Sequence, residues 1–183
     1  MERKGLNYDE VKKINPSIVY TEISGYTEKG PWKNKPGQDL LLQSLSGLTY
    51  TTGNRQDAPT PFGLAMGDYL CGNQAVQFII AALIKARKTG EGSLLQLSLM
   101  ESLIDFQFEF LTTYFHSGKM PQRSAISNAN PLLSAPYGIY KTADGYLAIA
   151  MMPLTELNQI LQSKDLQVYK EEDAFSKRDE IKQ

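Results

Sequence analysis

One acidic residue stands where a loop meets an apolar helix, and that position is suited to chemistry. The stretch Gly67-Asp68-Tyr69-Leu70-Cys71-Gly72 leads into the longest apolar run, so Asp68 is expected at the junction. An aspartate there commonly caps a helix. The helix dipole also keeps such a carboxylate ionised, and an ionised, partly desolvated carboxylate is a nucleophile toward activated acyl groups. The local pattern favours the cap, and the two roles are compatible.

Other common catalytic and nucleotide-binding patterns do not occur in the sequence. No G-x-G-x-x-G follows the strand predicted at 17–24, and the G-x-S-x-G of serine hydrolases is absent. Gly25 and Gly30 have the spacing of a P-loop, but Pro31 follows them in place of Lys-Ser/Thr. One Cys and one His argue against a nitrogen/sulfur zinc site, so we predict no metal. Cys71 is interpreted as a small buried hydrophobe.

The composition is that of an ordinary globular chain. It has 183 residues, of which 42% are hydrophobic. Its formal net charge of −1 gives no excess of basic residues that would favour binding to nucleic acid or to an anionic membrane. A single Cys excludes an internal disulfide, and we expect a reducing compartment, most simply the cytoplasm. Residues 1–7 lack the apolar stretch of a signal peptide. The apolar run 75–84 is too short to span a bilayer and predicts a helix buried in protein.

Periodicity and turn residues predict an α/β chain with few strands. The expected helices are 8–14, 39–48, 68–87, 100–115 and 154–161, and the expected strands are 17–24, 94–98, 137–141 and 146–151. Asp144-Gly145 between the last two strands predicts a hairpin. Residues 164–183 are expected to be solvated or frayed. Only two strands precede the proline-punctuated connection 118–136, which predicts a piece of a larger fold or one completed by a partner.

An ordered series of short motifs resembles the family III CoA-transferases, which include formyl-CoA and carnitine CoA-transferases. The series covers nearly the whole chain to about residue 152, and each piece is weak alone. In order, it comprises Asn15-Pro16 to Tyr26, Gly30-Pro31-Trp32, Lys35 to Asp39, Gln43 to Leu48, Gly67-Asp68, Thr89 to Gly92, Leu97 to Leu99, Ala135 to Gly138 and Ala143 to Tyr146.

The resemblance implies that Asp68 is the nucleophile of a CoA transfer. Asp68 attacks a donor acyl-CoA to give a mixed anhydride, and the released thiolate then forms an aspartyl-CoA thioester. An acceptor carboxylate takes up CoA by the reverse steps. This chemistry needs one oriented, ionised carboxylate shielded from water, since a hydrolysed anhydride is lost.

The resemblance also implies a CoA-binding role for three further residues. Arg3 matches a family arginine near the CoA phosphates, and Lys35 and Gln38 lie in a loop that borders CoA in relatives. From the residues alone, each is read more simply as a solvated or turn residue. Related α-methylacyl-CoA racemases have a histidine at the position of Gln38. Glutamine does not transfer a proton at neutral pH, so the transferase is favoured over the racemase.

The family's organisation implies an incomplete Rossmann-like large domain followed by the start of a smaller α+β domain. Residues 1–118 are predicted in the large domain, 119–136 in a linker and 137–183 in the small domain. Family members have roughly twice this length or more and form interlocked homodimers. Substrates would be an acyl-CoA and a small carboxylic acid, with no permanently bound cofactor. The alternative is a non-catalytic fragment or subunit of such an enzyme.

Overall fold

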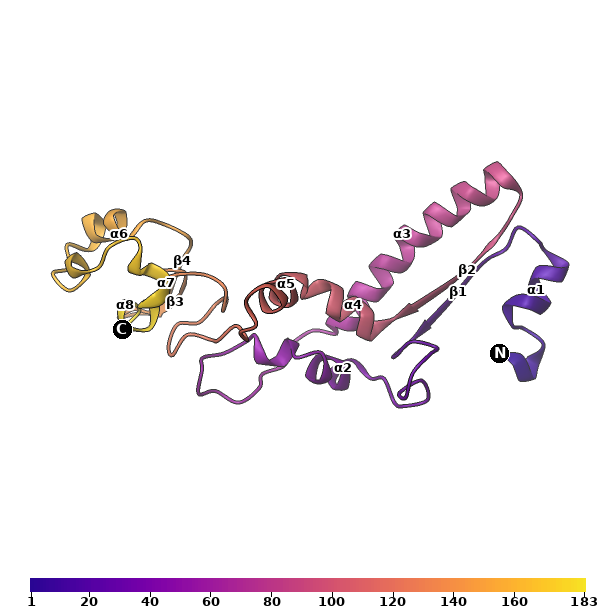
Figure 1. Ribbon diagram of the computed structural model, residues 1–183, viewed down its shortest axis with the longest axis horizontal. Coiled ribbons are helices and arrows are strands. Elements are labelled where there is room, and N and C mark those ends of the chain that lie inside the picture. The colour runs from indigo at the N-terminus through magenta and orange to yellow at the C-terminus, as the bar shows by residue number, and fades with distance from the viewer. The chain divides into compact units, whose positions relative to one another are not determined.

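The computed structural model describes residues 1–183, apart from the side chain of Glu2 (Figure 1). Its contacts form two compact units, the first made of Met1–Ser46 with Phe62–Gln107 and the second of Gly47–Pro61 with Phe108–Gln183. Each unit is described by itself. The division at 118 and 136 that the sequence suggests stays a prediction.

The first unit is built on two parallel strands joined by a long helix. Strand β1 (Val19–Ser24) pairs with β2 (Ser93–Ser98), with Val19 opposite Ser93 and Ser24 opposite Ser98. Helix α3 (Met66–Thr89) connects them and packs against both strands (Figure 1). The unit also contains the 3-10 helix η1 (Glu2–Lys4), α1 (Tyr8–Ile14), α2 (Asp39–Leu45) and α4 (Leu99–Phe106). This β-α-β unit confirms the predicted α/β class.

Helix α3 buries small residues and exposes large ones, which corrects the expectation of a buried helix. Gly67, Cys71, Ala75 and Ala82 are its buried residues, whereas Val76, Ile80, Leu83 and Ile84 are exposed. By length and hydropathy alone, α3 qualifies as a membrane span, although 17% of the qualifying window is buried in protein. One such helix is weak evidence, because core helices of water-soluble proteins qualify equally. A row of large apolar side chains on one face is typical of a surface that another protein segment covers.

The helix predicted at 100–115 is two helices, α4 and α5 (Phe108–Ser117). The break lies at Gln107, whose buried carboxamide donates to the carbonyls of Leu103 and Ser46, at 3.0 and 3.2 Å. At the start of α4, the Ser98 Oγ accepts from the Glu101 N–H and donates to the Glu101 carboxylate. This exchange resembles a capping box, for which Ser98-x-x-Glu101 is the sequence signal.

The second unit contains the predicted hairpin and a compact C-terminal segment. Strands β3 (Gly138–Lys141) and β4 (Tyr146–Ile149) pair antiparallel, and α6 (Leu154–Leu161) follows them. The short elements are η2 (Leu48–Tyr50), η3 (Leu166–Val168), α7 (Asp173–Ser176) and α8 (Arg178–Ile181).

The expectation of a solvated segment at 164–183 is wrong for its last residues. Arg178 and Lys182 are buried, and the Arg178 guanidinium donates to the carbonyls of Pro131 and Gln122. A third cation, Arg123, is buried with its guanidinium bonded to the carbonyls of Thr52, Arg55 and Asp57. Backbone carbonyls supply the hydrogen-bond acceptors that water would otherwise provide to these charges.

Candidate functional site

The candidate site lies at the edge of the first unit where both parallel strands end. Strand β1 ends at Ser24 and β2 at Ser98. Helix α3 connects the two strands and runs in the direction opposite to theirs, so its first turn lies at the edge where both strands end. Two contacts fix the arrangement. The Met100 N–H, in the first turn of α4, donates to the Gly25 carbonyl at 3.2 Å, and Lys85, near the other end of α3, reaches Ser93 at the start of β2. Ligands of open α/β sheets bind at this edge.

Asp68 lies in the first turn of α3 and is exposed to solvent, so the described residues do not provide the shielding from water that the expected chemistry needs. The expectation that it caps the helix is wrong, because the N-cap position is Ala65 and Asp68 lies three residues further on. Within the described part of the chain, no hydrogen bond or ion pair occupies the Asp68 carboxylate. One turn later, Cys71 is buried as predicted, and burial raises the pKa of its thiol, so Cys71 is unreactive.

Two residues that the sequence analysis did not single out hold the start of α3. Asp39 accepts a hydrogen bond from the Gly67 N–H at 2.6 Å through Oδ1, and from the Gln43 Nε2 at 2.6 Å through Oδ2. Gln43, fully buried, also bonds to the backbone of Phe62 and Leu64. The available signal was the spacing of Asp39 and Gln43, four residues apart on one helix, which is the spacing of a hydrogen-bonded pair.

The loop from Gly25 to Gly37 closes on itself and carries Lys35. The two glycines touch, since a Cβ on Gly25 would lie 2.5 Å from the Gly37 Cα. Inside the loop, the Tyr26 hydroxyl donates to the Pro36 carbonyl at 3.2 Å and the Tyr26 ring meets Trp32 edge to face. Lys35 is exposed on the loop, and Gln38, also exposed, is the N-cap residue of α2. Gln38 directly precedes Asp39. The Asp39 carboxylate accepts a hydrogen bond from the N–H of Gly67, the residue before Asp68.

Arg3 lies in a different place in the first unit. It lines a cavity of about 800 Å³ with Lys4 and Lys33, and Asp68 does not line that cavity. The same cavity contains the carboxylates of Asp9, Glu22 and Glu28. The lining thus includes as many acidic side chains as lysines and arginines, so it is less suited to phosphate than a purely cationic cluster. The CoA-binding roles of Arg3, Lys35 and Gln38 remain predictions.

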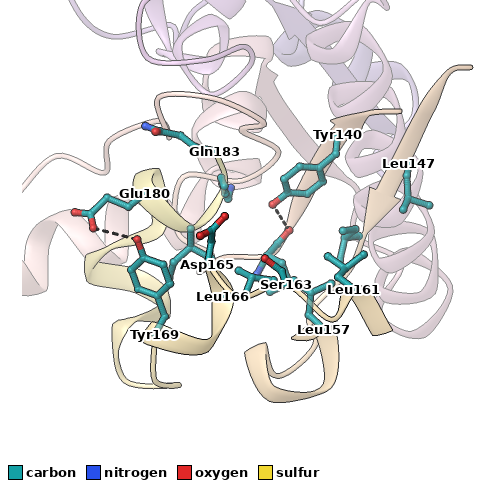
Figure 2. A pocket seen from close by; sticks show the side chains of 14 residues that line it. Tyr140, Leu147, Leu157, Leu161, Ser163, Asp165, Leu166, Tyr169, Glu180 and Gln183 are labelled. Atoms are coloured by element: carbon teal, nitrogen blue, oxygen red, sulfur yellow. Dashed lines mark hydrogen bonds between the residues drawn. The ribbon is translucent and has the colours of Figure 1, made fainter. Parts of the chain in front are cut away.

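A mainly apolar cavity of about 490 Å³ lies in the second unit, and Figure 2 shows the side chains around it. Leu147, Leu157, Leu161 and Leu166 form much of its wall, and the Tyr140 hydroxyl donates to the Pro136 carbonyl at 2.7 Å. Burial raises the pKa of Tyr140 to about 12. None of the predicted site residues lines this cavity.

Lys182, at the edge of that cavity, gives the second unit a pH-dependent stability. Its Nζ donates to the Ser124 Oγ at 3.2 Å and to the Ser127 carbonyl at 3.3 Å, with the side chain only 3% exposed. Burial, with a smaller contribution from Arg178, lowers the pKa of Lys182 to about 8. Above that pH, the unfolded chain holds a proton that the folded chain has released, so stability rises with pH.

We expect Lys182 to contribute an increase of about 2 kcal/mol to the free energy of unfolding between about pH 8 and pH 9.5. The Cys71 thiol, whose pKa burial raises, opposes this rise within the same window, and Tyr140 opposes it above about pH 10, where unfolded tyrosine begins to ionise. Urea titrations across this range measure the change. Lys182→Met removes the charge with a side chain one atom shorter, and the difference between the wild-type and variant profiles isolates the contribution of Lys182. An equally steep profile in the variant would contradict the assignment to Lys182.

Comparison with known proteins identifies the family. The family model described as CoA-transferase family III matches residues 1–183. The chain belongs to CoA-transferase family III. It is 33% identical over 151 residues to a succinate–glutarate CoA-transferase of Agrobacterium fabrum, covering 82% of this chain and 37% of that protein. An acetyl-CoA:oxalate CoA-transferase of Acetobacter aceti is 33% identical over 145 residues, covering 79% of this chain and 36% of that protein.

A solved structure supports the family III fold. A CaiB/BaiF family protein from Brucella suis superposes with a TM-score of 0.79 at 26% identity, covering all of this chain and 51% of that one. The chain spans about a third of the length of the curated relatives named above and half of this solved structure. The match confirms the predicted family and its mixed helix and strand architecture.

Proposed function

We propose that this family III chain supports transfer of CoA from an acyl-CoA to a carboxylic acid through a covalent intermediate on Asp68. The observation that carries the proposal is the state of that carboxylate. It is exposed, its oxygens have no partner among the described residues, and it lies in the first turn of the 24-residue α3, at the edge where both strands end. An ionised carboxylate in such a position is available to attack an activated carbonyl.

The reaction returns the aspartate to its starting state. An Asp68 oxygen bonds to the thioester carbonyl carbon and the carbon–sulfur bond breaks, giving a mixed anhydride and CoA thiolate. The thiolate attacks the Asp68 carbonyl carbon and expels the donor as its carboxylate. The acceptor carboxylate then attacks the aspartyl-CoA thioester and releases the thiolate, which takes the acceptor acyl group from the second anhydride. No step transfers a proton to or from Asp68, so it works as a nucleophile and not as a general acid.

CoA is a substrate in this proposal, and no permanently bound cofactor is required. Arg3, Lys35 and Gln38 are proposed to contact CoA, on the family resemblance stated above. Dicarboxylates are the first acceptors to examine, because the relatives are named for glutarate, succinate and oxalate. A homodimer and a cytoplasmic location remain predictions.

The proposal is tested on the polypeptide encoded by the complete gene. It is mixed with succinyl-CoA or acetyl-CoA and with glutarate or oxalate, and formation of the new CoA thioester is followed by chromatography. Borohydride added during turnover should reduce the aspartyl thioester, so that peptide mass spectrometry finds Asp68 converted to the alcohol. A modified residue other than Asp68, or transfer with no covalent species under any of these conditions, would contradict the proposed intermediate.

The same preparation separates a transferase from a racemase and from a binding subunit. A racemase exchanges the α-hydrogen of a 2-methylacyl-CoA with deuterium from the solvent, and Gln38 offers no acid or base for that exchange. We therefore expect no deuterium uptake. A protein that binds CoA, measured by titration calorimetry, but forms no adduct would support the non-catalytic alternative.

A further inference from the structure

The first turn of α3 is capped by a residue from another helix. Its own N-cap residue, Ala65, has no side chain that can accept a hydrogen bond, and the Gly67 N–H instead donates to the Asp39 Oδ1 at 2.6 Å. Gly67 is buried, and a Cβ there would lie 3.0 Å from that oxygen and 3.2 Å from the Leu103 Cδ1. The close approach of the Asp39 carboxylate therefore suits a glycine directly before Asp68.

Gln43 connects the same carboxylate to the segment that leads into α3. Its Nε2 donates to the Asp39 Oδ2 at 2.6 Å and to the Leu64 carbonyl at 3.0 Å, while its Oε1 accepts from the Phe62 N–H at 2.8 Å. The carboxamide is thus bonded in both directions to the chain at residues 62–64 and is itself only 1% exposed. A buried group with all these partners holds one rotamer.

The two aspartates at this edge have different surroundings. Both oxygens of Asp39 accept hydrogen bonds from N–H groups, and its side chain is partly buried. The Asp68 carboxylate, by contrast, is exposed and has no such partners in the described residues. The geometry points to Asp39 and Gln43 as positioning residues: together they fix the first turn of α3 and so hold the Asp68 carboxylate in line with the thioester carbonyl. This inference rests on the proposed function, because it assigns a purpose to the placement of Asp68.

The test uses four variants of the polypeptide encoded by the complete gene. Asp39→Ala removes the cap and the bond to Gln43. Asp39→Asn keeps one acceptor for the Gly67 N–H but places an NH2 group against the Gln43 Nε2. Combining Asp39→Asn with Gln43→Glu restores a donor–acceptor pair between the two side chains, although it loses the donor to Leu64. Asp105→Ala is the matched control, because Asp105 accepts from the Gln74 Nε2 at 2.9 Å in a similar pair that does not reach the first turn of α3.

Three measurements separate positioning from folding. Hydrogen exchange reports the protection of the Gly67 amide, single-turnover mass spectrometry gives the rate of CoA-adduct formation on Asp68 at saturating acyl-CoA, and titration gives the Kd for CoA. For Asp39→Ala we expect faster Gly67 exchange and a rate lowered by about 10²-fold, with the Kd changed by less than about twofold. Asp39→Asn should be intermediate, the double variant should recover part of the lost rate, and Asp105→Ala should match the wild type.

Each contrary result has a distinct meaning. An Asp39→Ala rate equal to that of Asp105→Ala overturns the positioning role and leaves the proposed function standing. A rate loss that merely follows the unfolded fraction, measured by circular dichroism, also overturns it. A wild-type protein that forms no adduct on Asp68 overturns the proposed function, and the positioning role with it.

Discussion

Asp68→Asn is expected to abolish CoA transfer and the covalent adduct, with turnover reduced by about 10³-fold or more. The amide has no ionised oxygen to attack a thioester carbonyl, and its nitrogen is a poor nucleophile. Because Asp68 is exposed and unpartnered among the described residues, the substitution should change the free energy of unfolding by no more than about 0.5 kcal/mol. Loss of activity in a normally folded protein would therefore report on chemistry.

Asp68→Glu makes the comparison sharper. It keeps the charge and moves the carboxylate outward by one methylene, which should lower the rate by about 10²-fold while leaving an adduct detectable. Measurements of turnover and of the borohydride-trapped peptide distinguish the two variants. Full turnover in Asp68→Asn would end the assignment of the nucleophile.

Gly25→Ala and Gly37→Ala are expected to be the most destabilising changes at the candidate site. A Cβ on Gly25 would overlap the Gly37 Cα, and one on Gly37 would overlap the Gly25 Cα. Backbone atoms on both sides must move apart, at a cost of about 3 kcal/mol for each variant. The displacement also separates the Gly25 carbonyl from the Met100 N–H and shifts Gln38 and Asp39, so the rate of adduct formation should fall as well.

Urea unfolding measures the loss, and the single tryptophan reports where it occurs. Trp32 is the only Trp of the chain and contacts Tyr26 inside this loop, so a shift in its emission marks a change at the loop before global unfolding. Gly72→Ala is the matched control. A Cβ on Gly72 meets nothing within 4 Å, and the residue lies inside α3, where alanine should add roughly 0.5–1 kcal/mol of stability. Equal stability of Gly25→Ala and the wild type would show that the two glycines need not touch.

Local patterns located most elements of this chain, and distant contacts explain what those patterns missed. Helices 8–14 and 154–161 have the predicted bounds, because the signals that define them are local: the apolar residues recur at helical spacing, and the turn residues directly flank them. The break at Gln107 depends on a bond to the Ser46 carbonyl, 61 residues away, which periodicity does not register. Charge counting likewise placed Arg178 and Lys182 in solvent, although a carbonyl and a hydroxyl far along the chain accept hydrogen bonds from them.

The candidate site shows the same division. Asp68 was found from its place between a loop and an apolar run, but the acceptor that caps the helix is Asp39, 28 residues earlier. The sequence therefore led to Asp68 and missed the residue that holds its backbone. The exposed face of α3 was missed because an apolar run is expected to be buried, and a local pattern does not show which side of a helix another segment covers.

The contact between Gly25 and Gly37 separates the loop at 25–37 from the rest of the first unit. Chain added between Gly25 and Gly37 leaves and returns at one point, and doubling the length of a flexible loop costs only about 0.6 kcal/mol in closure entropy. Insertions between Gly25 and Gly37 are therefore expected to cost little stability, provided that Trp32 keeps its contact with Tyr26 and Lys35 its proposed contact with CoA. Such insertions leave the Gly25–Gly37 contact in place, and with it the start of α3 that Asp39 holds.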